Sequence, residues 1–146
     1  MTIQRPDERS DARERALYLL YEAHSKGVAP ADTIELQVIE PDAMTQELVT
    51  GVGEWLDTLD AHIATHAKGW TLARMPVLDL SVMRLAVYEL LQRPDVPTAV
   101  VLNEAVELAK RFSTDDSGRF VNGVLAAIAA EIRPVAVAAE EPAQDV

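Results

Sequence analysis

The chain has 146 residues and a formal net charge of −11, a length that corresponds to one domain able to bury most of its apolar surface. It contains no cysteine, which excludes a disulfide framework and a thiolate metal site. No apolar run approaches the roughly 20 residues that cross a bilayer, and the first residues lack the apolar region of a signal peptide. We therefore expect a cytoplasmic protein with no membrane contact.

The negative charge is distributed unevenly along the chain. Residues 32–60 contain eight acidic residues and no Lys or Arg, whereas residues 68–93 contain four basic residues against two acidic ones. Because affinity for a polyanion rises with the number of cations placed against it, the overall charge disfavours indiscriminate nucleic-acid binding. Any nucleic-acid site must be local.

The first third of the chain predicts a flexible arm and two helices. Residues 1–8 form the arm, since Pro6 disfavours an early helix. A Ser-Asp pair can then cap a helix over residues 10–25, and Gly27 follows as its stop. A second, short helix begins near residue 30 and ends before Pro41.

A long helix is predicted from about Thr45 to Lys68. Its apolar residues recur at spacings of 3 and 4, which indicates near-parallel packing along a helix bundle. These residues are Val49, Val52, Leu56, Leu59 and Ile63. A Gly-Trp-Thr break at residues 69–71 follows, and then a single turn over residues 72–75.

The remaining chain predicts three helices and a tail. Residues 78–92 are apolar on nearly all sides, so this helix belongs at the centre of the molecule. A helix from residue 97 or 98 to Phe112 should carry an ion pair between Glu107 and Arg111. The last helix begins near Ser117, and residues 134–146 form a disordered acidic tail. The sequence thus predicts an all-α fold of six substantial helices in two packed subassemblies.

Residue patterns typical of catalysis or metal binding are weak. His62 and His66 have metal-capable spacing on one helix face, but no third ligand lies nearby in the sequence. We interpret them as residues on either side of the buried apolar stripe of this helix. Asp115 and Asp116 have the composition of a carboxylate pair for acid–base catalysis. Acidic residues at a helix N-terminus are also explained by the stabilisation of its free N–H groups. We expect no enzyme activity, no cofactor and no metal site.

The start of the last helix favours RNA binding. Arg119, Phe120 and Asn122 combine a cation, a ring and an amide, which together serve phosphate contact, base stacking and base-edge hydrogen bonding. The alternative is that Phe120 belongs to the core. Likewise, the arginines of the first helix are also explained as ordinary surface charge, paired in part with Asp11 and Glu14.

Three blocks of sequence resemble the NusB family of transcription antitermination factors. They are ARERALYLLYE, GWTLARMPVLDLSVMRLAVYELL and VLNEAVELAKRFSTDDSGRFVNGVL, and the resemblance covers roughly Arg9 to Ile132. It implies a NusB fold of six to seven helices forming two three-helix subdomains, within one RNA-binding domain over residues 9–133. It also implies a non-catalytic protein that binds boxA-type single-stranded RNA of ribosomal RNA leaders. The ribosomal protein NusE would bind with it, in an RNA polymerase antitermination complex.

The resemblance also implies which residues bind. The RNA-binding positions are Arg9, Arg13, Tyr21, Asp116, Arg119 and Phe120, and we add Arg15 on charge alone. Asp79 occupies the acidic position that faces NusE in the family. Arg84 and Glu89 are nearby candidates for the same partner surface.

One departure from the family concerns the first helix. Where the family runs three basic residues, this chain has Arg9, Ser10 and Asp11, and residues 1–15 contain four arginines against four acidic residues. We therefore predict weak RNA binding by the isolated protein, with a shallow salt dependence, and rescue by NusE. Two alternatives remain, namely the NusB-like domain of an rRNA cytosine methyltransferase and an interaction scaffold that has lost RNA binding. A homodimer is also possible.

Overall fold

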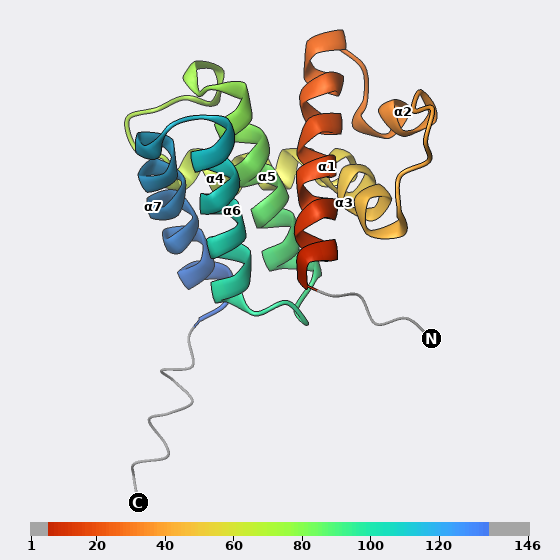
Figure 1. The fold of residues 1–146 in the computed structure, drawn as a ribbon. Helices are drawn as coiled ribbons and strands as arrows, with labels where there is room; N and C mark the ends of the chain where they lie inside the picture. The colour runs from red at the N-terminus through yellow and green to blue at the C-terminus, as the bar shows by residue number, and fades with distance from the viewer. Residues whose placement is uncertain (1–5, 135–146) are drawn as a thin grey trace, which may run out of the picture.

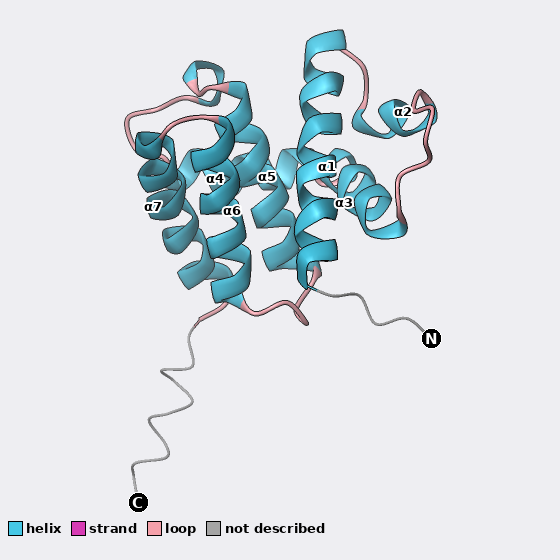
Figure 2. Cartoon of the chain, viewed as in Figure 1, coloured by secondary structure: helices cyan, strands magenta, loops and turns pink. Residues whose placement is uncertain are grey.

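The computed structural model describes residues 6–134, which form seven α-helices and one 3₁₀ turn without a strand (Figures 1 and 2). The helices are α1 (Pro6–Lys26), α2 (Pro30–Glu35), α3 (Ala43–Glu54), α4 (Leu56–His66), η1 (Leu72–Arg74), α5 (Val77–Gln92), α6 (Thr98–Phe112) and α7 (Asp115–Ile132). The all-α prediction is confirmed. Residues 1–5 of the predicted arm and residues 135–146 of the predicted tail lie outside the described residues.

Helix α1 begins earlier than predicted. It starts at Pro6 rather than at Ser10 or Asp11, so residues 6–8 of the predicted arm are helical. Proline is favoured in the first turn of a helix, where its missing N–H group has no partner to lose. The end is as predicted, because Gly27 has a φ of +67° and the N–H of Val28 reaches the carbonyl of Ala23 at 3.0 Å.

The predicted long helix is wrong, because the chain forms two helices that meet at Trp55. Trp55 has a φ of −103° and a ψ of 13°, which turns the axis between α3 and α4. Before the break, α3 lies against α1 and α2; after it, α4 lies against α5 and α7. The predicted core positions Val49, Val52, Leu59 and Ile63 are nevertheless fully buried.

Helix α5 lies at the centre of the molecule, as its composition predicts. It contacts α1, α3, α4, α6 and α7, and its side chains Val82, Met83 and Val87 are fully buried. Helices α2 and α3 lie on one side of α1, and α6 and α7 lie on the other (Figure 1). Both groups share one continuous hydrophobic core around α5.

The corner between α6 and α7 differs from the prediction in two details. Helix α7 begins at Asp115, because the hydroxyl of Thr114 accepts a hydrogen bond from the Ser117 N–H at 3.0 Å. Arg111 does not pair with Glu107 but with Glu14 of α1, at 3.0 Å. The close approach of the two helices occurs at Gly118, where a Cβ atom would lie 2.8 Å from Lys110 Cγ.

Arg133, directly after α7, closes the far end of the bundle. Its guanidinium donates five hydrogen bonds, four of them to the backbone carbonyls of Glu89, Leu90, Arg93 and Val96, and one to the hydroxyl of Thr98. Glu89 and Leu90 lie in the last turn of α5, where helix carbonyls begin to lack partners, and Arg93 directly follows it. The carbonyls of Glu89 and Arg93 also accept backbone bonds, from the N–H groups of Arg93 and Val96. Arg133 therefore caps α5 from the opposite end of the sequence.

Candidate nucleic-acid interface

The residues predicted at the start of α7 lie on the surface together. Arg119 is 75% exposed and forms an ion pair with Asp116, one helical turn earlier. Phe120 is half-buried, and its ring lies 5.9 Å from the ring of Trp70 at an interplanar angle of 58°. Trp70 comes from the segment between α4 and η1 and is 48% exposed. Two rings and one exposed cation thus share this end of the bundle.

A cavity of about 210 Å³ opens beside these rings, with Asp79 at its base. Trp70, Pro76, Asp116, Ser117 and Phe120 form the rest of its lining. Asp79 is 3% exposed; its Oδ2 accepts a hydrogen bond from the Ser117 hydroxyl at 2.9 Å. Its Oδ1 has no hydrogen-bond partner in the described part of the chain. A buried carboxylate oxygen without a donor is costly, so this cavity favours a ligand that brings an N–H group or a cation.

The structure buries Arg13, which the family resemblance assigns to RNA binding. The Arg13 side chain is 4% exposed, and its Nε and Nη2 atoms bond the two carboxylate oxygens of Glu89 at 2.7 and 2.9 Å. Its Nη1 reaches Glu104 at 3.3 Å. Burial alone lowers the pKa of Arg13, but the hydrogen bonds and charge of Glu89 outweigh it and leave the pKa raised. Glu89 and Glu104 thus hold an almost fully buried Arg13, which also belongs to the lining of a hollow beside Arg9.

The other three α1 candidates point to different places. Arg9 is half-buried and lines a hollow of about 240 Å³ with Pro97, Val100 and Glu104, at the start of α6. Arg15 donates to the carbonyl of Ile39 at 3.0 Å, on the side of α2 and α3. Tyr21 is 47% exposed. The structure therefore does not gather Arg9, Arg15 and Tyr21 into one cluster.

Arg9 and the α7 residues lie at opposite ends of α6. Arg9 lines a hollow with Val96 and Pro97, just before Thr98, whereas the Thr114 cap lies two residues after Phe112. A helix of 15 residues separates these ends by about 20 Å at 1.5 Å per residue. The predicted RNA residues thus mark the two ends of a strip along α1 and α6, a length that several nucleotides of an extended strand would cover.

Aromatic and charged groups that the sequence did not assign to binding lie between α1 and the last turn of α6, at the α7 end of this strip. The rings of Tyr18 and Phe112 meet edge to face at 5.6 Å, and the Arg111 guanidinium lies 4.9 Å above the Phe112 ring. Glu14 accepts hydrogen bonds from the Tyr18 hydroxyl at 2.7 Å and from Arg111 at 3.0 Å. The bond from Tyr18, and then Arg111, lowers the pKa of Glu14. The sequence signal was Tyr18 itself, an aromatic residue outside the apolar stripe of its helix.

The three candidate partner residues on α5 face three different neighbours. Asp79 faces α7 through Ser117, and Glu89 faces α1 through Arg13 and is 2% exposed. Arg84 faces α4, where it pairs with Asp60 through two bonds of 2.7 and 2.8 Å. Only Asp79 lines the cavity beside α7, so the structure does not bring the three into one surface.

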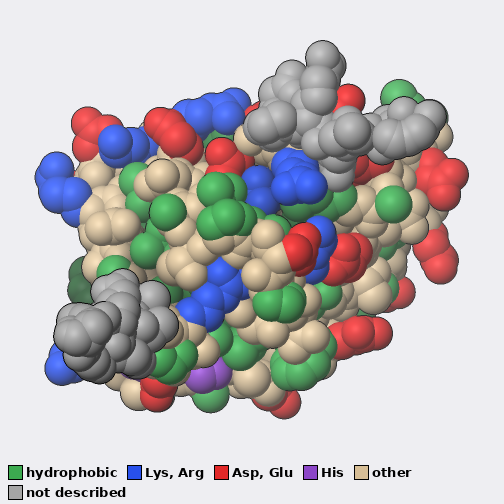
Figure 3. All heavy atoms as spheres, turned by 90° about the horizontal axis from the view of Figure 1, so that it is seen from below, with side chains coloured by type: hydrophobic (Ala, Val, Ile, Leu, Met, Phe, Trp, Pro, Cys, Tyr) green, Lys and Arg blue, Asp and Glu red, His purple; other side chains and the backbone are tan. Residues whose placement is uncertain are grey.

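Charge on the face that contains the start of α1 is mixed. Seen from below, Lys and Arg side chains occur in separate places among Asp and Glu, and the edge towards α2 and α3 is acidic (Figure 3). No helix of the described residues is long and apolar enough to cross a membrane. His62 and His66 lie 3.8 and 3.3 Å from Glu131 of α7, and the described residues contain no group of three or more His, Cys, Asp or Glu arranged to hold a metal ion.

Comparison with known proteins gives consistent matches over most of the chain. The model of the NusB family matches residues 10–130. The transcription antitermination protein NusB of Saccharopolyspora erythraea is 50% identical over 127 residues, which is 83% of this chain and 86% of that protein. A structure of T. maritima NusB is 32% identical with a TM-score of 0.77, covering 84% of this chain and 91% of the other. NusB and NusE in complex with dsRNA gives 26% identity and a TM-score of 0.73, covering 84% and 96%.

Proposed function

Because this chain belongs to the NusB family, we propose that it is a transcription antitermination factor that binds boxA-type RNA of ribosomal RNA leaders together with NusE. It acts by binding alone, without a chemical step, as part of the antitermination complex on RNA polymerase in the cytoplasm. The likeness to a complex of NusB and NusE with RNA supports this assignment. The observation that carries it is the strip along α1 and α6, which ends in the cavity at Asp79.

In this proposal the exposed groups of the strip bind the RNA. Arg119 and Arg111 contact phosphates, and the rings of Phe120, Trp70 and Tyr18 stack on bases, since both kinds of contact are typical of single-stranded RNA recognition. Arg9 extends the surface to the start of α6, and Tyr21 and Asp116 flank it. Arg13 is a positioning residue that holds α1 against α5 and α6 through Glu89 and Glu104.

The cavity at Asp79 is the proposed contact for NusE. The unpartnered Oδ1 of Asp79 favours a cationic side chain from a basic ribosomal protein, and the exposed carboxylate of Asp116 adds to the attraction at the rim. Arg84 and Glu89 are left out of the partner surface, because Asp60 and Arg13 occupy their charged groups.

Charge reversal at Arg119 tests the RNA site. Arg119→Glu should lower the affinity for a labelled boxA-type RNA about tenfold in the presence of NusE, because one phosphate contact becomes a repulsion. Fluorescence anisotropy measures the affinity. Lys26→Glu, which changes the net charge equally at the far end of α1, is the matched control and should bind like the parent protein.

The runner-up is an interaction scaffold without RNA binding. Two observations favour it: Arg13 is buried, and the first 15 residues contain as many acidic residues as arginines. A scaffold would bind NusE and lose no RNA affinity on Arg119→Glu. An RNA affinity that is absent in the parent protein, with NusE present, would favour this second function over the first.

A further inference from the structure

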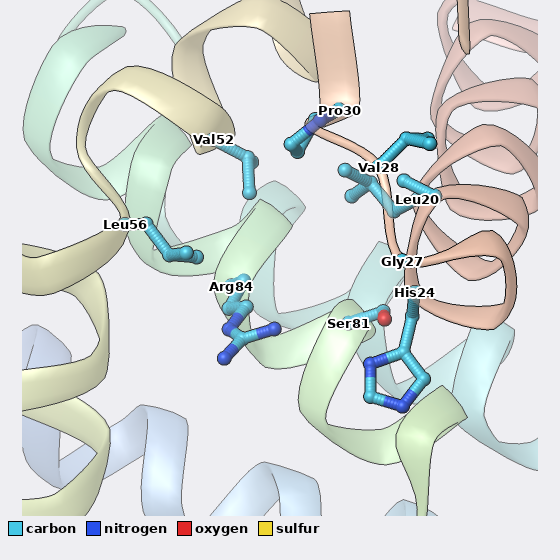
Figure 4. A pocket seen from close by; sticks show the side chains of 10 residues that line it. Leu20, His24, Gly27, Val28, Pro30, Val52, Leu56, Ser81 and Arg84 are labelled. Atoms are coloured by element: carbon cyan, nitrogen blue, oxygen red, sulfur yellow. The ribbon is translucent and has the colours of Figure 1, made fainter. Parts of the chain in front are cut away.

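Another cavity lies between α5 and the first four helices, and no residue of α6 or α7 lines it. It has a volume of about 290 Å³ and opens between the end of α1, the start of α2, the junction of α3 and α4, and the middle of α5. Its two halves differ in polarity. Leu20, Val28, Pro30 and Val52 occupy one side in Figure 4, whereas Ser81, Arg84 and His24 occupy the other.

The polar half offers donors without matching acceptors. Ser81 is 4% exposed and its hydroxyl has no hydrogen-bond partner among the described residues, although it lines the cavity. Arg84 pairs with Asp60 through Nε and Nη2, which leaves its Nη1 amino group without a partner in the same part of the chain. No Asp or Glu lines this cavity, in a protein whose net charge is −11. The polar half is therefore suited to an anionic acceptor.

We propose that this cavity binds a small amphipathic carboxylate. The carboxylate accepts hydrogen bonds from Arg84 Nη1 and the Ser81 hydroxyl, with the imidazole of His24 at the rim, and the apolar group of the ligand lies among Leu20, Val28 and Val52. A charge-assisted bond in a partly buried site and the burial of an apolar chain both favour binding. This volume is at the lower limit for small-molecule sites, so the ligand is small. The bound ligand would join α1 to α5 and to the α3–α4 junction.

Two sources supply this chemistry, a free fatty carboxylate or the C-terminal residue of a peptide. Octanoate represents the first source, and an uncharged-side-chain tripeptide ending in leucine represents the second. The experiment uses the whole protein without RNA or NusE, so its outcome is independent of the antitermination function. Two-dimensional ¹H–¹⁵N NMR titrations follow the backbone amides of Leu20, Gly27 and Ser81.

We expect saturable shifts of these amides with octanoate or with the peptide, and binding about tenfold weaker with octanol or acetate. Octanol lacks the carboxylate, and acetate lacks the apolar chain. Arg84→Gln and Ser81→Ala should each weaken binding of the carboxylate about tenfold. Asp60→Asn is the matched control for Arg84→Gln, because it breaks the same ion pair and keeps the cation, so it should bind at least as well as the parent protein.

Thermal unfolding of each variant verifies that it is folded. The proposal is overturned if octanol binds as well as octanoate, since the polar half would then have no role. Equal loss of binding in Arg84→Gln and Asp60→Asn also overturns it, because the ion pair and not the cation would then be responsible. The absence of saturable shifts with both carboxylates has the same consequence.

Discussion

The guanidinium of Arg13 lies between two carboxylates in the interior, and its removal leaves a buried charge on Glu89. We predict that Arg13→Met lowers the free energy of unfolding by about 3–5 kcal/mol, the typical effect of breaking a buried ion pair from one side. Glu89→Gln should act in the same direction. Urea denaturation followed by circular dichroism measures the change.

The double variant Arg13→Met, Glu89→Leu is the control for this prediction. It removes both charges and should recover most of the lost stability, because apolar pairs of similar volume replace buried ion pairs well. An Arg13→Met protein that is as stable as its parent but binds boxA-type RNA poorly would contradict the positioning role and return Arg13 to the RNA surface.

Glu14 links stability to pH through its bonds with Tyr18 and Arg111. Because the pKa of Glu14 is lowered in the folded state, its ionised form stabilises the fold above the ordinary glutamate pKa of about 4.3, and this stability is lost as the pH falls through the lower, folded pKa. We predict that Glu14→Gln unfolds with less pH dependence below about pH 5 than the parent protein. Thermal melts across pH measure this. Parallel curves for the two proteins would exclude Glu14 as the linked group.

At this scale the sequence does not predict which charged group a side chain meets. It favours a surface position for Arg13, as an RNA-binding residue or as ordinary surface charge, whereas the structure buries it. Its partner Glu89 is 76 residues away, and no local pattern indicates which carboxylate a flanking arginine will meet. Ser81 is a similar case, since its burial follows from the apolar helix around it, but its cavity depends on four other helices.

Helix α3 approaches α5 closely because residue 51 is glycine. A Cβ atom at Gly51 would lie 2.3 Å from the Tyr88 ring, which has little room to move since its hydroxyl also bonds Glu47. We predict that Gly51→Ala lowers the free energy of unfolding by about 1–3 kcal/mol through overpacking. Calorimetry measures the change in Tm.

Gly123 supplies the matched control on α7. Its Cβ position is open, with no atom within 4 Å, and it lies in the interior of a helix. Gly123→Ala should therefore raise the free energy of unfolding by about 0.5–1 kcal/mol, because alanine is the better helix former. A stabilising Gly51→Ala would mean that Tyr88 can turn aside at no cost.

The helix boundaries could be predicted from the sequence only where a local residue property sets them. The 3 and 4 spacing from Val49 to Ile63 identified four fully buried positions and the half-buried Leu56, but it continued across the break at Trp55. No proline marks this break. The turn allows α3 to pack on α1 and α4 to pack on α7, and both contacts join residues far apart in the sequence. By contrast, the end of α1 at Gly27 was predictable because the left-handed conformation is a local property of the residue.

Across the whole molecule, charge should decide how RNA affinity responds to salt. The isolated protein has a net charge of −11, and of its α1 arginines Arg13 is buried and Arg15 bonds the α2–α3 loop. Few phosphate contacts release few counterions, so we predict weak binding to boxA-type RNA with a shallow slope of log affinity against log salt. Addition of NusE should raise the affinity. Titrations at several salt concentrations test this, and tight binding by the protein alone with a steep slope would contradict it.

The proposed RNA surface could be predicted from the sequence only in part. Family resemblance supplied residues at both ends of the strip, Arg9 at one and Arg119 and Phe120 at the other. Their separation depends on the length and direction of α6 between them. Trp70 reaches the same surface only because the α4–α5 connection folds over α7, so its contact with Phe120 is a property of the tertiary structure.

The cap that Arg133 places on α5 has a consequence for the order in which the chain folds during translation. Its bond to the carbonyl of Arg93 spans 40 residues, so α5 leaves the ribosome well before Arg133, which donates five hydrogen bonds at and beyond the end of this helix. Until then these bonds are missing, and the ion pair of Arg13 with Glu89 holds α1 to the same end of α5. The nascent domain therefore becomes fully stable only after α7 has emerged, when the proposed RNA-binding strip and its support are completed in the same step.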